Sequence, residues 1–80
     1  MTLHLQPVKV GTGSADQEGQ LVFKGGFLIA VLVQLSDYHE HDTGKWFLEA
    51  DFGQIDVVVK PVFDSLDVAQ EWIERRLSSD

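Results

Sequence analysis

The stretch FLIAVLVQL, residues 27–35, decides the fold expected for this chain. Its β-branched residues and the two glycines just before it favour a β-strand over a short buried helix. Side chains alternate between the two faces of a strand. One face would carry Phe27, Ile29, Val31, Val33 and Leu35, and the other would carry Leu28, Ala30, Leu32 and Gln34. Both faces are apolar, which predicts an inner strand of a sheet.

Neighbouring stretches predict the strands that pair with this inner strand. Residues 21–23 precede it across Gly25 and Gly26, and a Gly-Gly pair between β-like runs predicts a two-residue hairpin. One long strand kinked at the glycines is the alternative. Residues 46–52 alternate apolar and polar side chains, which predicts a half-buried strand with one wet face. Its apolar face would carry Trp46, Leu48, Ala50 and Phe52, and residues 55–60 would form a further strand.

The first part of the chain predicts an edge strand followed by a loop. Leu3 and Leu5 alternate with polar residues, but the apolar positions after Pro7 are Val8 and Val10, so the phase slips by one residue. Proline lacks the N–H that a central ladder needs, so we expect an edge strand that is broken or bulged near Pro7. Residues 11–20 are rich in glycine and polar side chains, and they predict a mobile surface loop.

The last part of the chain predicts an amphipathic helix over residues 65–78. Asp64 is the expected N-cap, and Phe63 and Val68 are expected to form a hydrophobic staple around it. Asp67 in the first turn and Arg75 and Arg76 in the last turn complement the helix dipole. The apolar stripe that would pack on the sheet consists of Leu66, Ala69, Ile73 and Leu77, with Trp72 at its flank.

Together these elements predict one α+β domain over residues 1–80, a small antiparallel sheet of four to five strands with one C-terminal helix packed on one face. One helix covers one face of a small sheet, so apolar side chains on the other face need a different cover. We expect Leu28, Leu32, Trp46 and Phe47 to form that uncovered surface. Its cover would be a second copy of the chain, the first strand curling over the sheet, the loop at 11–20, or an unidentified protein partner.

Composition excludes several classes of function. Thirteen Asp and Glu oppose six Lys and Arg, which gives a net charge of −7. Nucleic acid and anionic membrane surfaces are bound by clustered basic residues, so neither is an expected partner. No apolar run approaches the roughly 20 residues that cross a membrane. The chain has no Cys and no secretory signal, so we expect a cytoplasmic protein without disulfides or Cys-ligated zinc.

The residues that carry chemistry are few. Asp37, His39, His41 and Asp42 form a cluster that could bind a divalent metal if a loop brought them together. Glu49 and Asp51 alternate on one strand, as solvated acids commonly do, and no serine lies in a nucleophile elbow. We therefore expect a non-enzymatic protein-interaction or self-association module with no cofactor. The alternative is a metal-binding protein that uses the loop at 37–42.

Overall fold

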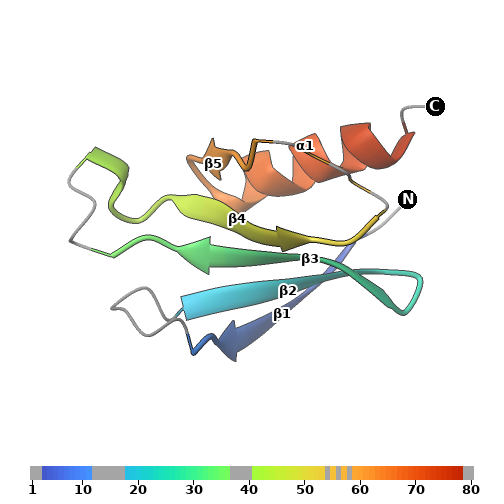
Figure 1. Cartoon of the computed structure of the whole chain (residues 1–80), viewed down its shortest axis with the longest axis horizontal. Helices are drawn as coiled ribbons and strands as arrows, with labels where there is room; N and C mark the ends of the chain where they lie inside the picture. The colour runs from blue at the N-terminus through green and yellow to red at the C-terminus, as the bar shows by residue number, and fades with distance from the viewer. Residues whose placement is uncertain are drawn as a thin grey trace.

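Within the residues described, five strands form one antiparallel sheet in which each strand pairs with its neighbours in the chain, and one helix follows (Figure 1). This is a computed structural model, and it describes residues 3–11, 18–36, 41–53, 55, 57 and 59–78. The elements are β1 His4–Lys9, β2 Glu18–Lys24, β3 Phe27–Gln34, β4 Trp46–Asp51, β5 Val62–Phe63 and α1 Leu66–Ser78. The predicted fold class, an α+β domain with an antiparallel sheet and a C-terminal helix, is confirmed.

β3 is the central strand of the sheet, as its two apolar faces predict, and it is joined to β2 by a tight hairpin. The turn consists of Gly25 and Gly26, whose φ angles of 56° and 85° lie in the left-handed region. Glycine adopts this region without steric cost, and two such residues in succession form the primed turn that matches the twist of a hairpin. The hairpin prediction is therefore correct, and the alternative of one kinked strand is wrong.

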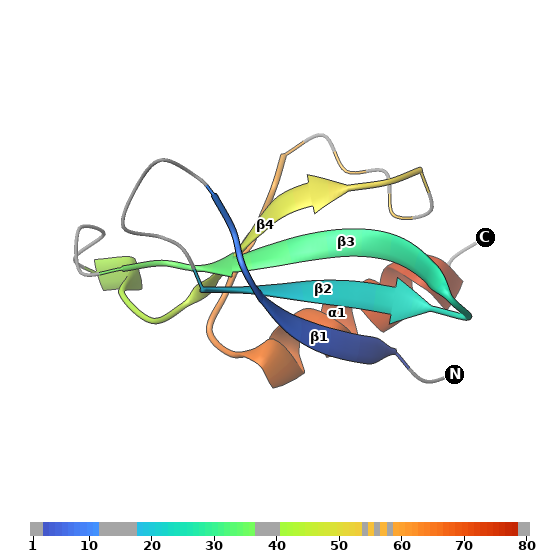
Figure 2. The same cartoon turned by 90° about the horizontal axis from the view of Figure 1, so that it is seen from below.

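β1 is an edge strand, as predicted, but it is not broken or bulged at Pro7. Its pairing with β2 runs without a shift from His4 opposite Phe23 to Lys9 opposite Glu18. The phase slip instead places the apolar residues before and after Pro7 on opposite faces of the sheet, while the pairing stays regular. Leu5 packs against the core under the helix, whereas Val8 lies on the opposite side of the sheet. The strong twist of the sheet permits this, and β1 runs at a steep angle to β2 and β3 (Figure 2).

Two bulges interrupt the pairing of β3 with its neighbours. Val22 lies opposite Ala30 and Phe23 lies opposite Leu28, so Ile29 is an extra residue on β3. On the other side, Val31 lies opposite Ala50 and Leu32 opposite Leu48, so Glu49 is an extra residue on β4. Each extra residue reverses the alternation of side chains beyond it. The prediction that side chains alternate regularly between the two faces along residues 27–35 and 46–52 is therefore wrong.

The fifth strand is shorter than predicted and lies later in the chain. It consists of Val62–Phe63, which pair with Phe47 and Trp46, and not of residues 55–60. Residues 54, 56 and 58 lie outside the described part. Ile55 is buried in the core, whereas Val59 is exposed, so these two residues do not share a face. The segment contributes an apolar anchor without joining the ladder.

The helix begins at Leu66, and its N-cap is Ser65 and not Asp64. The Val68 N–H donates to Ser65 Oγ at 3.2 Å, which satisfies an amide that has no partner inside the helix. The Asp64 carboxylate instead approaches Lys45 Nζ, at 3.4 Å. Val68 is exposed, so the predicted staple with buried Phe63 is absent.

The rest of the helix follows the prediction. Ala69 and Ile73 are fully buried, and Leu66 and Leu77 pack beside them against the core. The predicted loop at 11–20 is shorter at its C-terminal end, because Glu18 already begins β2. Residues 12–17 lie outside the described part, so the expected mobility of this loop stays a prediction.

Candidate interaction surface

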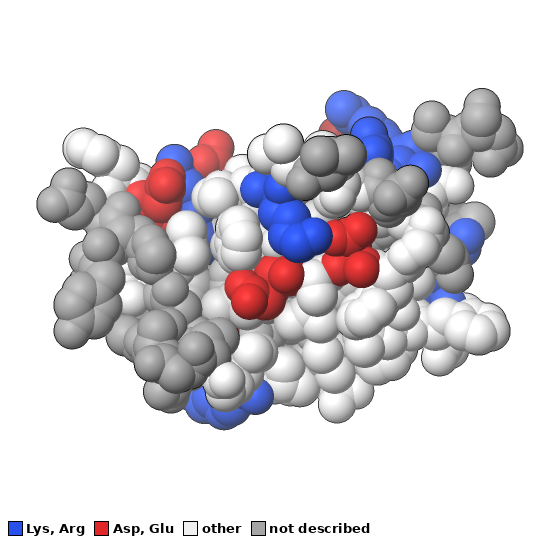
Figure 3. Space-filling view, in the orientation of Figure 1, with Lys and Arg blue, Asp and Glu red and all other residues white. Residues whose placement is uncertain are grey.

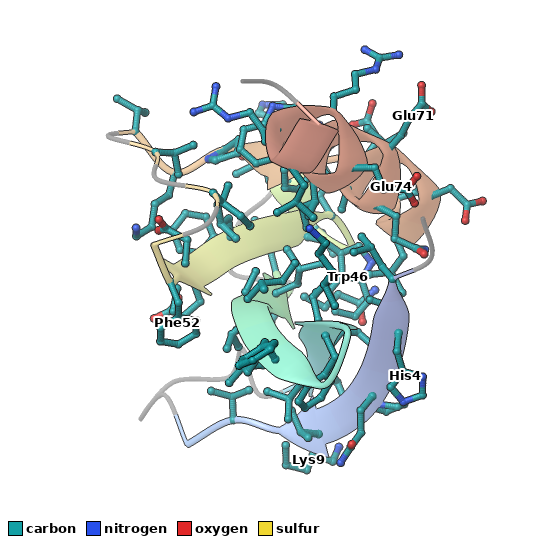
Figure 4. All side chains as sticks on the ribbon, turned by 90° about the vertical axis from the view of Figure 1, so that its right-hand side faces the viewer. His4, Lys9, Trp46, Phe52, Glu71 and Glu74 are labelled. Atoms are coloured by element: carbon teal, nitrogen blue, oxygen red, sulfur yellow. The ribbon has the colours of Figure 1, made fainter. Side chains whose placement is uncertain are left out.

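The helix covers the face of the sheet that carries Val22, Ala30, Leu32 and Leu48. These buried side chains form one core with Ala69 and Ile73 of α1, and Phe63 of β5 joins them. Ile29, the extra residue at the first bulge, also enters this core. Trp46 lies opposite Phe63 in the β4–β5 ladder and packs between the sheet and the helix (Figure 4). This face is closed by the chain itself.

In the part of the chain that the structure describes, no helix lies on the opposite face of the sheet, and we call it the open face. The register places its residues: Leu21 lies opposite Val31, Val33 opposite Phe47, and Phe47 opposite Val62. Phe23 and Leu28 form a further pair beyond the first bulge. The apolar residues of the open face with partly or largely exposed side chains are Val8, Leu21, Phe23, Leu28, Val31, Phe47, Ala50 and Val62.

These side chains form a continuous surface, because neighbouring strands lie only about 4.8 Å apart. Leu28 is 37% exposed and Val62 is 41% exposed, and the others are half-buried. The paired strand positions on this face carry no Lys, Arg, Asp or Glu in the part of the chain described. In Figure 3 acidic and basic side chains lie in the middle of the view, and the area below and to the right of them is uncharged. The described open-face positions of β2 and β3 are therefore apolar, whereas β4 carries exposed Glu49 at its bulge.

The end of β1 covers one corner of this face. A Cβ atom built on Gly19 would lie 2.5 Å from Val10 Cγ2, so the Val10 side chain lies directly over this glycine. Gly19 pairs with Val33, which is only 2% exposed although it belongs to the open face. The alternative in which the first strand curls over the sheet is thus realised at this corner. No described residue is shown to cover the surface from Leu21 to Val62 in this way.

The four residues predicted to form one surface are divided between the two faces. Leu28 and Phe47 belong to the open face, as expected. Leu32 is fully buried under the helix, and Trp46 packs there too, so neither contributes to the open face. Apolar alternation on β3 does not indicate which face the helix occupies, and the bulge at Ile29 moves Leu28 away from Leu32. The sequence did not identify the other residues of the open face, because an apolar side chain does not by itself indicate which face of the sheet it lies on. These residues are Val8, Leu21, Phe23, Val31, Ala50 and Val62.

The predicted metal ligands are not brought together in the part of the chain described. Asp37 and His39 lie outside the described residues, His41 is exposed, and Asp42 Oδ1 lies 3.3 Å from Lys45 Nζ. Lys45 also approaches Asp64, and its bond to Asp42 is the main reason why its pKa is raised. Among residues 3–11, 18–36, 41–53, 55, 57 and 59–78, no group of three potential ligands converges. Asp42 is thus engaged by Lys45, which links the loop before β4 to Asp64 near the start of the helix.

The two acids on β4, Glu49 and Asp51, have different environments. Asp51 is 10% exposed in its side chain; its Oδ1 accepts a hydrogen bond from Lys60 Nζ at 2.5 Å, and its Oδ2 accepts one from the Val57 N–H at 3.4 Å. The bond from Lys60 is the main reason why the pKa of Asp51 is lowered. Glu49 is exposed at the bulge. The Asp51 pair therefore holds the segment after β4 against the sheet.

Asp51→Asn is expected to lower stability at neutral pH and to weaken the acid sensitivity of folding. Because folding lowers the pKa of Asp51, its ionised form stabilises the fold above the ordinary value of 3.8, and this stabilisation is lost as the pH falls through the lower folded-state pKa. Urea unfolding at pH 7 and pH 3 measures the effect. The variant's deficit should shrink at pH 3, whereas Glu49→Gln should show little deficit at either pH. A deficit for Asp51→Asn that is equal at both values would contradict this role.

Comparison with family models, with curated proteins and with solved structures gives no match to this chain. No helix in the described part is long and apolar enough to cross a membrane. The feature that bears on function is therefore the open face itself, which combines exposed apolar side chains with an uncharged strip over β2 and β3.

Proposed function

We propose that this chain is a non-enzymatic protein-interaction module and that the open face is its docking surface. The observation that carries the proposal is the continuous set of partly exposed apolar side chains on a face that the helix does not cover. Monomeric proteins rarely leave such surfaces unused, and contiguous apolar patches commonly mark binding sites. Burial of a Val, Leu or Phe side chain contributes about 1.5–3 kcal/mol, so docking on this face has a large apolar driving force.

The edges of the sheet are poorer docking sites than its face. An exposed edge strand binds a partner through a row of free N–H and C=O groups. β1 carries Pro7 in its middle, which lacks an N–H, and Lys9 at its end, which pairs with Glu18. β5 is only two residues long. Both edges therefore have features that oppose strand addition, and the face is the favoured surface.

The polar residues of the described part support an interaction role more than a catalytic one. Asp51 pairs with Lys60, and Asp42 pairs with Lys45, within the chain. Such pairs join one segment to another and leave few acid or base groups for chemistry. The apolar face, by contrast, has no role in packing the helix.

The proposal is tested by the accessibility of the open face in solution. A fluorescent dye that binds exposed apolar surface should bind the wild-type chain at low micromolar protein concentration, and Leu28→Lys should reduce that binding several-fold. Val68→Lys is the matched control, because Val68 is 47% exposed on the outer side of α1 and the substitution adds the same charge. Circular dichroism confirms that all three proteins are folded. Absence of dye binding, or equal loss in both variants, would contradict the proposal.

A further inference from the structure

We propose that the partner on the open face is a second copy of this chain, with the two sheets stacked face to face about a two-fold axis. This inference rests on the proposed function and adds to it the identity of the partner. Homodimers with two-fold symmetry use the same patch on both copies, so the patch must be compatible with itself in charge, shape and area. Each of these three properties is visible in the structure.

Charge is the first property. The chain carries a net charge of −7, so most ways of bringing two copies together oppose like charges. The described acids that lie on α1 are Asp67, Glu71 and Glu74, on the other side of the sheet from the open face. The paired strand positions of the open face hold no charged residue among those described. Glu49, the extra residue at the bulge of β4, is exposed one strand away from β3. The strip over β2 and β3 is therefore the part of this face where two copies of the acidic chain can meet without opposing like charges.

Shape is the second property. At one corner of the open face the end of β1 rises over Gly19, because Val10 lies on top of it. Toward the other side, no such contact over Phe47 and Val62 is seen among the described residues. A two-fold axis parallel to the central strand places the β1 side of each copy opposite the β4–β5 side of the other. The raised corner of one copy then meets the lower part of its partner, twice.

Area is the third property. Four strands spaced by about 4.8 Å and about six residues long at 3.3 Å each give a face of roughly 400 Å² in projection. Once the relief of side chains is included, two stacked faces bury on the order of 1,200 Å² of accessible surface, at the lower end for specific interfaces. Interfaces at this lower end include weak and reversible associations. Two antiparallel sheets packed this way would form a sandwich with helices on both outer sides.

Sedimentation equilibrium from about 1 to 500 μM tests this inference. We expect a monomer–dimer equilibrium for the wild-type chain, a dissociation constant raised at least tenfold by Leu28→Lys, and no such change for Val68→Lys. Dye binding per chain should also fall as the wild-type dimer forms. Because the chain contains no cysteine, introduced cysteines report contacts directly. Val31→Cys, at the centre of the open face, should form a covalent dimer on oxidation faster than Val68→Cys on the helix.

The outcomes separate this inference from the proposed function. If the wild-type chain stays monomeric at 500 μM but its dye binding depends on Leu28, the proposal of a homodimer is wrong. The proposal that the open face is a docking surface then still stands. A dimer that is equally sensitive to Leu28→Lys and Val68→Lys, or that crosslinks equally at both cysteine positions, shows contact elsewhere and also overturns the inference. A chain that neither binds the dye nor associates overturns both proposals.

Discussion

Leu32→Ala is expected to lower the free energy of unfolding by about 2–5 kcal/mol, the range for removing a buried leucine side chain from a packed core. Leu32 is fully buried on β3, between β2 and β4 and under α1, in the same cluster as Leu48 and Ile73. A chain of this length has only about 4–12 kcal/mol of stability, so this single substitution removes a large share of it. Urea unfolding followed by circular dichroism measures the loss.

Leu28→Ala is the matched comparison, because it makes the same change four residues earlier on the same strand. Leu28 is 37% exposed on the open face, so less packing is lost than at fully buried Leu32, and the expected cost is about 1 kcal/mol. The two substitutions therefore distinguish the structure from simple alternation, which places both leucines on one surface. Equal costs for Leu28→Ala and Leu32→Ala would show that the assignment of faces is wrong.

Phe63→Ala is expected to cost about 3–5 kcal/mol, the range for truncating a buried aromatic residue. Phe63 is buried in β5, lies opposite Trp46 in the ladder, and has its ring centroid 5.3 Å from that of Trp72 on the helix. It thus joins the edge of the sheet to α1. The expected loss is measured by urea unfolding, with tryptophan fluorescence as a second readout, since both tryptophans neighbour this ring.

Two further substitutions control for a general effect of changing β5. Val62→Ala, at the adjacent residue on the open face, should cost little, because Val62 packs against no described element of the core. Phe63→Leu should fall between Val62→Ala and Phe63→Ala, since leucine keeps apolar volume but loses the aromatic contact. A cost for Val62→Ala as large as that for Phe63→Ala would mean that the short strand, and not the buried ring, stabilises this junction.

Much of the fold could be predicted from local patterns. Gly25 and Gly26 specify a primed turn because few other residues adopt their φ angles. The spacing of Leu66, Ala69, Ile73 and Leu77 specifies a helix with one apolar stripe, and these residues do face the sheet. The helix cap was misassigned by one residue, since Asp64 and Ser65 are both good caps and the choice depends on a contact with Lys45 from a distant part of the chain.

The sequence predicts that one face of the sheet has no helix on it, but it does not predict which residues lie on that face. That one face of the sheet lacks a cover follows from a single helix and an inner strand that is apolar on both sides. Which residues lie on that face depends on Ile29 and Glu49, the extra residues at two bulges. A bulge arises where two strands of different twist and length are fitted together, and neither strand shows it alone. The bulge at Ile29 is the reason why Leu28 and Leu32 lie on different faces. Trp46 and Phe47 are adjacent residues, and alternation alone places them on opposite faces.

The sequence by itself determined the order of the elements, the hairpin turn and the stripe of the helix, because each depends on residues close together in the chain. Only the tertiary structure decided which side of the sheet the helix covers, where the register shifts, and how the end of β1 folds over Gly19. Those features depend on packing between segments far apart in the chain. Both faces of β3 are apolar, so its sequence alone does not decide which of them the helix covers. The side that the helix left uncovered became the open face.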